Sequence, residues 1–298
     1  ILTPVPPNLP PEIWIIFDYP KISIDTNPNS PYFGNTYVFA NAVYFPDYGY
    51  SQGFFTIHND GSITTKNMGI GDAFTSTVVG PNGEIYAARP ANTVAISLDG
   101  GTNFEEHTIT QVSGWCGARV STTSDRAWLL YRGPELAIDS NGRIYAVWAQ
   151  PQECVEDPDF EWGQYGLDFD VYLSFSDDKG VTWSNPVKVN DDLSVGDQGF
   201  PSIAVDGEGI IYIAFLDHRD NQDIAQYDVY LSKSFDSGLS FSQNIKVNDI
   251  SVPNVYGGRE PGDYLDMVAI GESKIFVSHP CVNTNYQQTG DASDACVT

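Results

Sequence analysis

Apolar and polar residues alternate along much of the chain in short runs separated by turn-forming residues. One stretch, VYLSFSDDKGVTWSNPVKVND at 171–191, recurs 58 residues later as VYLSKSFDSGLSFSQNIKVND at 229–249. Alternation with a period of two is typical of half-buried β-strands, and tight turns join such strands into hairpins. Each copy therefore predicts two antiparallel strands, and the recurrence indicates a chain built from repeats.

Both copies contain the pattern Ser-x-Asp-x-Gly-x-(Thr/Ser)-(Trp/Phe), and a less complete copy lies upstream. The three sets are Ser176, Asp178, Gly180, Thr182 and Trp183; Ser234, Asp236, Gly238, Ser240 and Phe241; and Ser97, Asp99, Gly101 and Phe104. Ser and Asp side chains can bond to the amides of a turn, glycine supplies a positive φ, and the aromatic ring can fold back over the hairpin. The pattern predicts a structural turn, with the ring of Trp183 buried.

A second repeated hairpin has the form strand, Asp-x-x-Gly turn, strand. It is clearest at 134–148 (PELAIDSNGRIYAVW) and 201–215 (PSIAVDGEGIIYIAF), with weaker copies at 22–44, 76–88 and 267–278. Three of these five copies are followed by the Ser-x-Asp-x-Gly hairpin, and the copy at 22–44 by a degenerate version at 59–61. Four antiparallel strands in about 60 residues correspond to one blade of a propeller.

Three copies of Ser-x-Asp-x-Gly resemble the Asp-box, or BNR repeat, of the sialidase-like β-propellers. The resemblance implies an all-β fold of four-stranded antiparallel blades, with the boxes at the blade periphery and away from the ligand. Five repeats can be counted, and six blades are the alternative because sialidase-like propellers usually have six. We expect a proline-rich spacer at 1–11 and one propeller domain at 12–298, with segment 12–17 supplying the outer strand that the fifth unit lacks.

The composition restricts the partners. The 298 residues include 14 Lys and Arg against 39 Asp and Glu, a net charge of −25. Such a chain repels phosphate backbones and anionic lipid, so we expect no nucleic acid as a partner. No apolar run approaches the roughly 20 residues that a membrane helix needs, so we expect no membrane insertion. The acidity suits either a solvated surface in salty surroundings or loops that collect divalent cations.

The cysteines and the start of the chain favour export. The chain begins at Ile1 with a proline-rich stretch, which looks like a spacer left after a leader or an upstream segment was removed. Four cysteines without a CxxC pair fit disulfides better than a metal site. We expect an extracellular or cell-surface protein in which Cys116 pairs with Cys154 and Cys281 with Cys296. The alternative is four free thiols in a cytosolic chain.

The meander order places the repeated turns at one end of the blades and the long connections at the other. Long loops on a rigid scaffold are where binding groups concentrate. The candidate ligand-binding residues in these loops are Arg119, Arg126, Trp128, Trp162, Tyr165, Asp217, Arg219, Arg259, Asp263 and Tyr264. Arginines pair with carboxylates and aromatic rings stack on sugars, so the set suits a glycan or protein ligand. The alternative is that Arg126 and Arg219 neutralise neighbouring aspartates.

A cation site is a second hypothesis for the same end. The pool of acids is Glu156, Asp157, Asp159, Glu161, Asp168, Asp191 and Asp192, with Asp197 nearby. Calcium prefers six to eight oxygen ligands and tolerates irregular loops, so Ca²⁺ suits this pool better than zinc. The sequence predicts no cofactor that the protein requires.

The resemblance to sialidases implies three arginines that hold the substrate carboxylate, a tyrosine nucleophile activated by a glutamate, and an aspartate as acid/base. The early (Phe/Tyr)-Arg-Ile-Pro motif of that family is absent, since Tyr19-Pro20-Lys21-Ile22 lacks the arginine. No phosphate-binding loop, serine nucleophile elbow or Cys-His signature is present. The leading hypothesis is a non-catalytic extracellular propeller for binding or surface assembly. An exo-sialidase-like glycoside hydrolase is the alternative, and the oligomeric state stays open.

Overall fold

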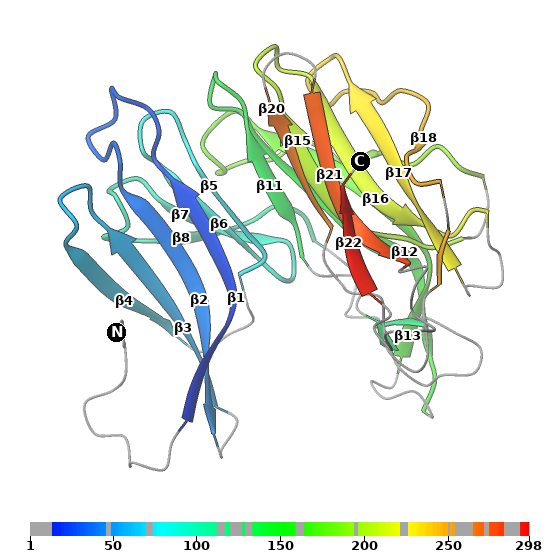
Figure 1. Cartoon of the computed structure of the whole chain (residues 1–298), viewed down its shortest axis with the longest axis horizontal. Helices are drawn as coiled ribbons and strands as arrows, with labels where there is room; N and C mark the ends of the chain where they lie inside the picture. Colours follow the sequence, from blue (N-terminus) through cyan, green and yellow to red (C-terminus); the bar gives the residue numbers. More distant parts are fainter. Residues whose placement is uncertain are drawn as a thin grey trace.

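The computed structural model describes residues 14–45, 49–69, 74–111, 117–119, 127–128, 133–158, 164–193, 196–220, 226–249, 251–253, 265–270, 274–282 and 293–297. Regular structure in this part of the chain consists of β-strands alone (Figure 1). Within it, no helix has the length and apolar character needed to cross a membrane. The spacer predicted at 1–11 lies outside the described residues.

Blades 1 and 2 are four-stranded antiparallel sheets whose strands follow chain order. Blade 1 contains β1 (Trp14–Ile24), β2 (Thr36–Phe45), β3 (Gly49–Ile57) and β4 (Ile63–Gly69). Blade 2 contains β5 (Ser76–Val79), β6 (Ile85–Arg89), β7 (Thr93–Ser97) and β8 (Glu105–Thr108). The hairpins predicted at 22–44 and 76–88 are therefore present.

Blades 3 and 4 repeat the same four-stranded meander and carry added strands. Blade 3 contains β11 (Glu135–Ile138), β12 (Ile144–Glu156), β13 (Gln164–Ser176) and β14 (Val187–Lys188). Blade 4 contains β15 (Gln198–Val205), β16 (Ile211–Asp217), β17 (Gln226–Ser234) and β18 (Ile245–Lys246). The added strands are β9 (Gly117–Arg119) and β10 (Ala127–Trp128) in blade 3, and β19 (Val252–Pro253), which pairs with β17.

Blade 5 shows three strands in the described residues: β20 (Asp266–Ile270), β21 (Lys274–Val282) and β22 (Ser293–Val297). The prediction that segment 12–17 completes this blade is wrong. Residues 14–17 belong to β1, where Trp14 pairs with Phe45 and Phe17 with Ala42. The physical reason is that this segment and the first strand of the first hairpin form one continuous strand, β1. The backbone of β1 is therefore hydrogen-bonded to β2 in blade 1.

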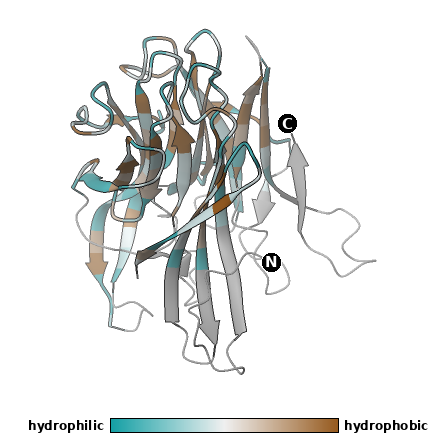
Figure 2. Ribbon diagram, turned by 90° about the vertical axis from the view of Figure 1, so that its left-hand side faces the viewer, coloured by the Kyte–Doolittle hydropathy of each residue, from teal (hydrophilic) through white to brown (hydrophobic). Residues whose placement is uncertain are grey.

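The innermost strands follow one another around an axis, with contacts from β1 to β5, then β11, β15 and β20. The five sheets match the five repeats, and the predicted all-β propeller of four-stranded antiparallel blades is confirmed. Each blade has one face toward the preceding blade, here called its backward face, and one toward the following blade, its forward face. Hydrophobic residues are concentrated in the strands (Figure 2).

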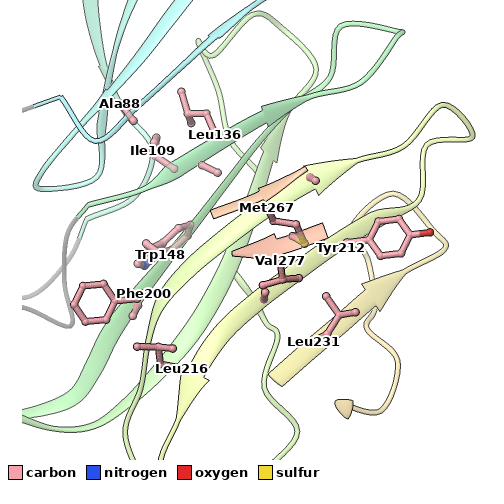
Figure 3. Close-up of a cluster of buried hydrophobic side chains, with 14 of the residues drawn as sticks. Ala88, Ile109, Leu136, Trp148, Phe200, Tyr212, Leu216, Leu231, Met267 and Val277 are labelled. Atoms are coloured by element: carbon pink, nitrogen blue, oxygen red, sulfur yellow. The ribbon is translucent and has the colours of Figure 1, made fainter. Parts of the chain in front are cut away.

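The core consists of apolar side chains packed between consecutive blades. Tyr37 and Phe39 of blade 1 pack with Ile85 and Ala87 of blade 2. A larger cluster runs from Ala88 in blade 2 past Trp148 in blade 3 to blades 4 and 5, where its residues include Met267 and Val277 (Figure 3). Because a blade has two apolar faces, burial of both against neighbours is the main source of its stability.

The turn between the third and fourth strands has the hydrogen bonds expected from its sequence. In blade 3, Ser176 Oγ lies 2.8 Å from Asp178 Oδ1 and accepts the Gly180 amide at 2.8 Å, while Asp178 Oδ1 accepts the Thr182 amide at 2.8 Å. Blades 2 and 4 repeat all three bonds at 2.8–2.9 Å, beginning at Ser97 and Ser234. These side chains stabilise their own turns.

The turn of blade 3 also makes packing contacts, through Gly180 and Trp183. Gly180 has φ +84°, and a Cβ there would lie 2.6 Å from Ile96 Cδ1 of blade 2, so the turn also packs on the preceding blade. Trp183 is half-buried, which corrects the expectation of a buried ring. Its Nε1 donates to Gly180 O at 3.0 Å, and this position over the hairpin leaves part of the ring in solvent.

Candidate functional site

The two ends of the blades differ as the meander order predicts (Figure 1). The hairpin turns that follow Ile24, Val79, Ile138 and Val205 share one end with the Ser-x-Asp-x-Gly turns, and we call this the turn end. The opposite end, which we call the long-loop end, carries the long β12–β13 hairpin. Its ladder continues past the end of β11, from Gln150 paired with Asp170 out to Glu156 paired with Gln164.

A small sheet projects at the long-loop end of blade 3. Strand β9 runs parallel to β13, with Gly117 opposite Tyr165, and β10 pairs with β9, with Trp128 opposite Ala118. Three of the predicted ligand-binding positions, Arg119, Trp128 and Tyr165, therefore lie on adjacent strands of one sheet. The other predicted positions in long loops, Arg126, Trp162, Arg259, Asp263 and Tyr264, lie outside the described residues.

Cys154 lies on the opposite edge of the same ladder, paired with Gly166, and is disulfide-bonded. Cys116 lies outside the described residues. In blade 5, Cys281 pairs with Asp294 and Cys296 with His279, so the two cysteine positions are offset by two along neighbouring strands. Both cysteine pairings stay predictions.

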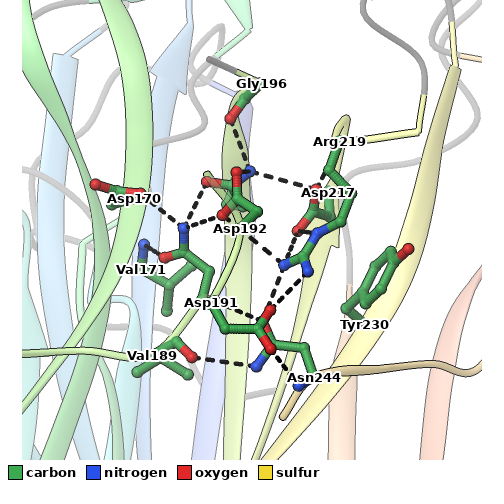
Figure 4. A network of polar contacts seen from close by, with 12 residues as sticks. Asp170, Val171, Val189, Asp191, Asp192, Gly196, Asp217, Arg219, Tyr230 and Asn244 are labelled. Atoms are coloured by element: carbon green, nitrogen blue, oxygen red, sulfur yellow. Dashed lines mark hydrogen bonds and ion pairs between the residues drawn. The ribbon is translucent and has the colours of Figure 1, made fainter. Parts of the chain in front are cut away.

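Arg219 is held by residues of blade 4 and of the connection from blade 3 (Figure 4). Its Nε donates to Asp217 Oδ2 at 2.8 Å, one Nη donates to Asp191 Oδ1 at 2.7 Å, and the other donates to Asn244 Oδ1 at 2.9 Å. The guanidinium also lies 4.2 Å from the centre of the Tyr230 ring. This arrangement matches the alternative interpretation in which Arg219 neutralises nearby aspartates.

The electrostatics of this pair follow from burial. Asp217 is fully buried, and burial raises the pKa of its carboxyl although hydrogen bonds from Arg219 and Gln198 oppose the shift. Burial tends to lower the pKa of Arg219, but its bonds to Asp217 and Asp191 outweigh that and raise it. The cation and the buried carboxylate stabilise each other, so removal of either leaves a buried charge without its partner.

The same set of polar contacts, made by an asparagine, an aspartate and a lysine, occurs at the long-loop end of blade 3 and of blade 4. In blade 3, Asn190 Oδ1 accepts the Val171 amide at 2.9 Å, Asn190 Nδ2 donates to Asp170 Oδ1 at 2.6 Å, and Lys188 pairs with Asp170. The same contacts are made in blade 4 by Asn248, Val229, Asp228 and Lys246. Sequence reasoning missed Asp170 and Asp228, although Asp-Val-Tyr-Leu-Ser and Lys-Val-Asn occur in both repeats.

Two further acids lie between blades 3 and 4. Burial is the largest cause that raises the pKa of Asp197, and Asp168 adds to it, while Phe169 N, which donates to Asp197 Oδ1 at 3.1 Å, opposes it. Burial also raises the pKa of Asp168, with Asp170 next in effect. His218 lies beside them, with Nδ1 3.0 Å from the Asp197 carbonyl oxygen. These carboxyls hold their protons to higher pH than exposed aspartates do.

The acidic residues that were predicted to bind a cation lie at different places and have different partners. Glu156 and Asp157 lie at the tip of the β12–β13 hairpin, Asp191 binds Arg219, and Asp192 accepts a hydrogen bond from Asn190. Asp159 and Glu161 lie outside the described residues. In the part of the chain that the structure describes, no three His, Cys, Asp or Glu side chains are placed to hold a metal ion. Calcium binding stays a prediction.

A separate charged group lies at the axis. Glu135 is the first residue of the innermost strand β11, and Lys21 Nζ of β1 lies 3.5 Å from its Oε1. Ser76, the first residue of β5, hydrogen-bonds the Glu135 carboxylate and accepts the Leu136 amide at 3.0 Å. Asp266, the first residue of β20, acts on Glu135 by its charge. Four innermost strands thus bring these residues together.

The pKa of Glu135 lies above its usual range. Burial, the largest cause, raises the pKa of Glu135, and Asp266 raises it further, while Lys21 and Ser76 oppose the shift. A carboxyl with a raised pKa can act as a proton donor, and enzymes use two carboxyl groups together in acid/base chemistry. Comparison of the repeats could have identified Glu135 from the sequence, because blade 4 has Ser202 at the position where blade 3 has Glu135.

No protein-family model and no curated protein matches the chain by sequence. Among solved structures, it is similar to a protein of unknown function from Dyadobacter fermentans, with a TM-score of 0.55 and 14% identity over 95% of this chain and 79% of that one. An α-L-arabinanase from Penicillium chrysogenum, complexed with arabinobiose, gives a TM-score of 0.51 and 11% identity over 88% and 74%.

An ulvan lyase, bound to a GlcA(1-4)Rha3S saccharide, gives a TM-score of 0.53 and 13% identity over 92% of this chain and 68% of that one. Identities this low show a shared fold alone. The likeness to known structures therefore supports the propeller architecture, while membership of the sialidase-like family stays a resemblance carried by the sequence motifs.

Proposed function

We propose that this protein is an exported carbohydrate-binding β-propeller whose ligand lies at the long-loop end of the central axis. The observation that carries the proposal is the set of Lys21, Glu135 and Asp266 on three innermost strands. The equivalent positions of blades 2 and 4 carry the small residues Ser76 and Ser202. Carboxylates and an ammonium group around a propeller axis suit the hydroxyls of a sugar.

Residues farther from the axis at the long-loop end favour the same class of ligand. The sheet formed by β9, β10 and β13 places the aromatic positions Trp128 and Tyr165 at the long-loop end. Aromatic rings provide flat apolar surfaces on which sugar rings can stack. Two of the similar structures carry saccharides, which are an arabinobiose and a GlcA(1-4)Rha3S saccharide. Glycan is therefore favoured over protein as the ligand, and the net charge of −25 disfavours nucleic acid.

Glycoside hydrolysis is the second candidate, because Glu135 has the raised pKa of a general acid and Asp266 is a second carboxylate. Recognition of a sialic acid carboxylate is less well supported. The arginines with described side chains, Arg89, Arg143 and Arg219, all bind carboxylates of the protein. A neutral or weakly charged saccharide is the better substrate class for this alternative.

Calorimetry with arabinobiose and with an ulvan disaccharide tests the site. We compare the parent, Glu135→Gln, and Glu208→Gln, which makes the same change at an exposed position of the turn end. Binding that falls at least about tenfold in Glu135→Gln alone supports the axial site, because it removes a charge-assisted hydrogen bond to a hydroxyl. Equal affinity in all three proteins, or no binding of either sugar, contradicts the proposal for these ligands.

Release of reducing sugar separates the two candidates. Binding of a longer oligosaccharide without release supports the non-catalytic propeller. Release by the parent and by Glu208→Gln, with loss of at least about a hundredfold in Glu135→Gln, supports hydrolysis with Glu135 as the acid. Release that survives in Glu135→Gln places the chemistry elsewhere.

A further inference from the structure

Blades 3 and 4 each hold a tyrosine at the same place on the backward face, but they surround it differently. Tyr172 pairs with Trp148 across β13 and β12, and Tyr230 pairs with Phe215 across β17 and β16. The two ring pairs have nearly the same geometry, with centroids 6.3 and 6.5 Å apart and interplanar angles of 27° and 22°. The repeat therefore allows a direct comparison of what covers each tyrosine.

In blade 4 the protein itself covers the tyrosine ring. The guanidinium of Arg219 lies 4.2 Å from the centre of the Tyr230 ring, and Figure 4 shows the two side chains next to each other. The fully buried carboxylate of Asp217 holds the guanidinium there, since Arg219 Nε donates to Asp217 Oδ2 at 2.8 Å. With this group in place, 8% of Tyr230 is exposed.

The tyrosine of blade 3 has no such cover. By strand register, Gln152 occupies the position of Arg219. Its Nε2 donates to Tyr172 Oη at 2.6 Å, so the amide meets the hydroxyl edge of the ring and leaves the face. Over the ranges that the structure describes, no cation lies over this ring. Tyr172 is correspondingly more exposed than Tyr230.

The amide groups beside the Tyr172 ring have hydrogen-bonding capacity to spare. Gln152 Nε2 also donates to Asp170 Oδ2 at 2.6 Å, while Gln152 Oε1 accepts no bond from a described residue. Gln150 Oε1 accepts the Trp148 indole N–H at 2.9 Å, and Gln150 Nε2 donates to none of the described residues. Gln150 points to the same side as Trp148, two positions before it on the strand. One acceptor and one donor therefore flank the ring.

The charges around the ring favour a neutral ligand. The buried carboxylate of Asp170 is already paired with Lys188. The neutral Gln150 also takes the position of Asp217, the carboxylate that holds the guanidinium in blade 4. A cation on the face of the Tyr172 ring would therefore lack the partner that Arg219 has.

We propose that the open face of Tyr172 is a subsite for an uncharged sugar ring, separate from the axial site. A flat C–H face of the sugar stacks on the aromatic ring. Its hydroxyls donate to Gln152 Oε1 and accept from Gln150 Nε2, because a hydroxyl is both a donor and an acceptor. Tyr172 is on the third strand of blade 3, whereas Glu135 is on the innermost strand, with β12 between them. The subsite therefore does not depend on binding at the axis.

An NMR titration with cellotetraose, a neutral saccharide whose rings have flat C–H faces, tests the subsite. The side-chain amide signal of Gln150 reports binding beside the ring, and it is expected to shift saturably in the parent. Gln152→Arg supplies in blade 3 the group that covers the ring in blade 4, so the dissociation constant is expected to rise at least about tenfold. Because Gln152 is exposed, this variant is expected to melt with the parent.

Three further variants complete the series. Tyr172→Ala removes the stacking surface and is expected to abolish the Gln150 shift. Tyr172→Phe keeps the ring and loses only the hydroxyl, so its affinity is expected to stay within about threefold of the parent. Glu208→Gln, at an exposed position of the turn end, is the matched surface control and is expected to bind as the parent does.

The outcomes separate this subsite from the axial site. A parent without a Gln150 shift, or the parent's dissociation constant in Gln152→Arg, overturns the proposal. A shift that is lost in Glu135→Gln and kept in Tyr172→Ala also overturns it, because the saccharide then lies at the axis. Saturable binding of arginine methyl ester at Gln150, without binding of cellotetraose, shows that the ring takes a cation and likewise contradicts a sugar subsite.

Discussion

The aspartates of the Ser-x-Asp-x-Gly turns and two of the acids at the long-loop end satisfy their oxygens in different ways. At the turn end, Asp178 and Asp236 bond to residues at most four positions away in the sequence. At the long-loop end, Asp191 accepts the Asn244 amide over 53 positions, and Lys21 reaches Glu135 across the axis. Local bonds form in any blade that has the motif, while distant bonds require the blades to be in place first.

The difference also concerns charge. In the Ser-x-Asp-x-Gly turns, Asp178 and Asp236 are exposed and Asp99 is partly exposed, and hydrogen bonds from hydroxyl and amide groups of the same turn lower the pKa of all three. At the long-loop end, burial raises the pKa of Asp197, Asp217 and Glu135. The three aspartates of the turns therefore stay ionised to lower pH, whereas Asp197, Asp217 and Glu135 keep their protons to higher pH than exposed carboxyls do. Functional groups are expected at the second kind of end.

Replacement of two tryptophans compares the core with the turn. Trp148 is fully buried between blades, and Trp148→Ala is expected to cost roughly 3 to 5 kcal/mol of unfolding free energy, because it leaves a large cavity. Trp183→Ala removes a half-buried ring over the turn and is expected to cost about 1 to 2 kcal/mol. Urea denaturation measures both. Equal losses contradict the placement of Trp183 at the edge of the core.

Arg219→Met tests the buried charge of the long-loop end. It leaves the fully buried Asp217 without its cation, and we expect a loss of roughly 3 kcal/mol at pH 7 by the same denaturation method. The double variant Asp217→Asn with Arg219→Met removes both charges and is expected to recover most of that loss. If the double variant is as unstable as the single one, packing of Arg219 on Tyr230 is the larger contribution.

Alanine substitution at two glycines with positive φ measures how much the contact between a turn and the preceding blade contributes to stability. Gly180 (φ +84°) faces Ile96, while Gly209 (φ +83°) has nothing within 4 Å of an added Cβ. We expect Gly209→Ala to cost about 1 kcal/mol, from backbone strain alone, and Gly180→Ala about 2 kcal/mol. Thermal denaturation of both variants, and of Gly180→Ala with Ile96→Val, measures the difference. No relief from Ile96→Val contradicts crowding as its cause.

The smallest effect is the titration of Asp236. Hydrogen bonds from Ser240 lower the pKa of Asp236 from 3.8 to about 2. Its contribution to stability is therefore complete above its ordinary pKa and is lost as the pH falls through about 2. A carboxyl NMR titration is expected to give a midpoint near 2 in the parent, and Ser240→Ala is expected to raise it. A midpoint near 4 in the parent shows that the turn is open in solution.

The sequence by itself determined the repeats and what is local to them. The alternation predicted the hairpins at 134–148 and 201–215, and the Ser-x-Asp-x-Gly pattern predicted turns whose hydrogen bonds close within four residues. Strand order then follows, because a short turn can join only neighbouring antiparallel strands. The same meander order placed the long loops at one end.

Only the tertiary structure decided which distant residues meet. Nothing near 14–17 in the sequence shows that this segment pairs with β2 rather than with blade 5, because both pairings suit an apolar strand. Glu135 and Lys21 are 114 positions apart, counted from their residue numbers, and become neighbours through the ring. Arg219 was chosen from the sequence as a ligand group, and its donors are used by Asp217, Asp191 and Asn244. Side-chain partners across blades depend on the angle between sheets, which local patterns do not encode.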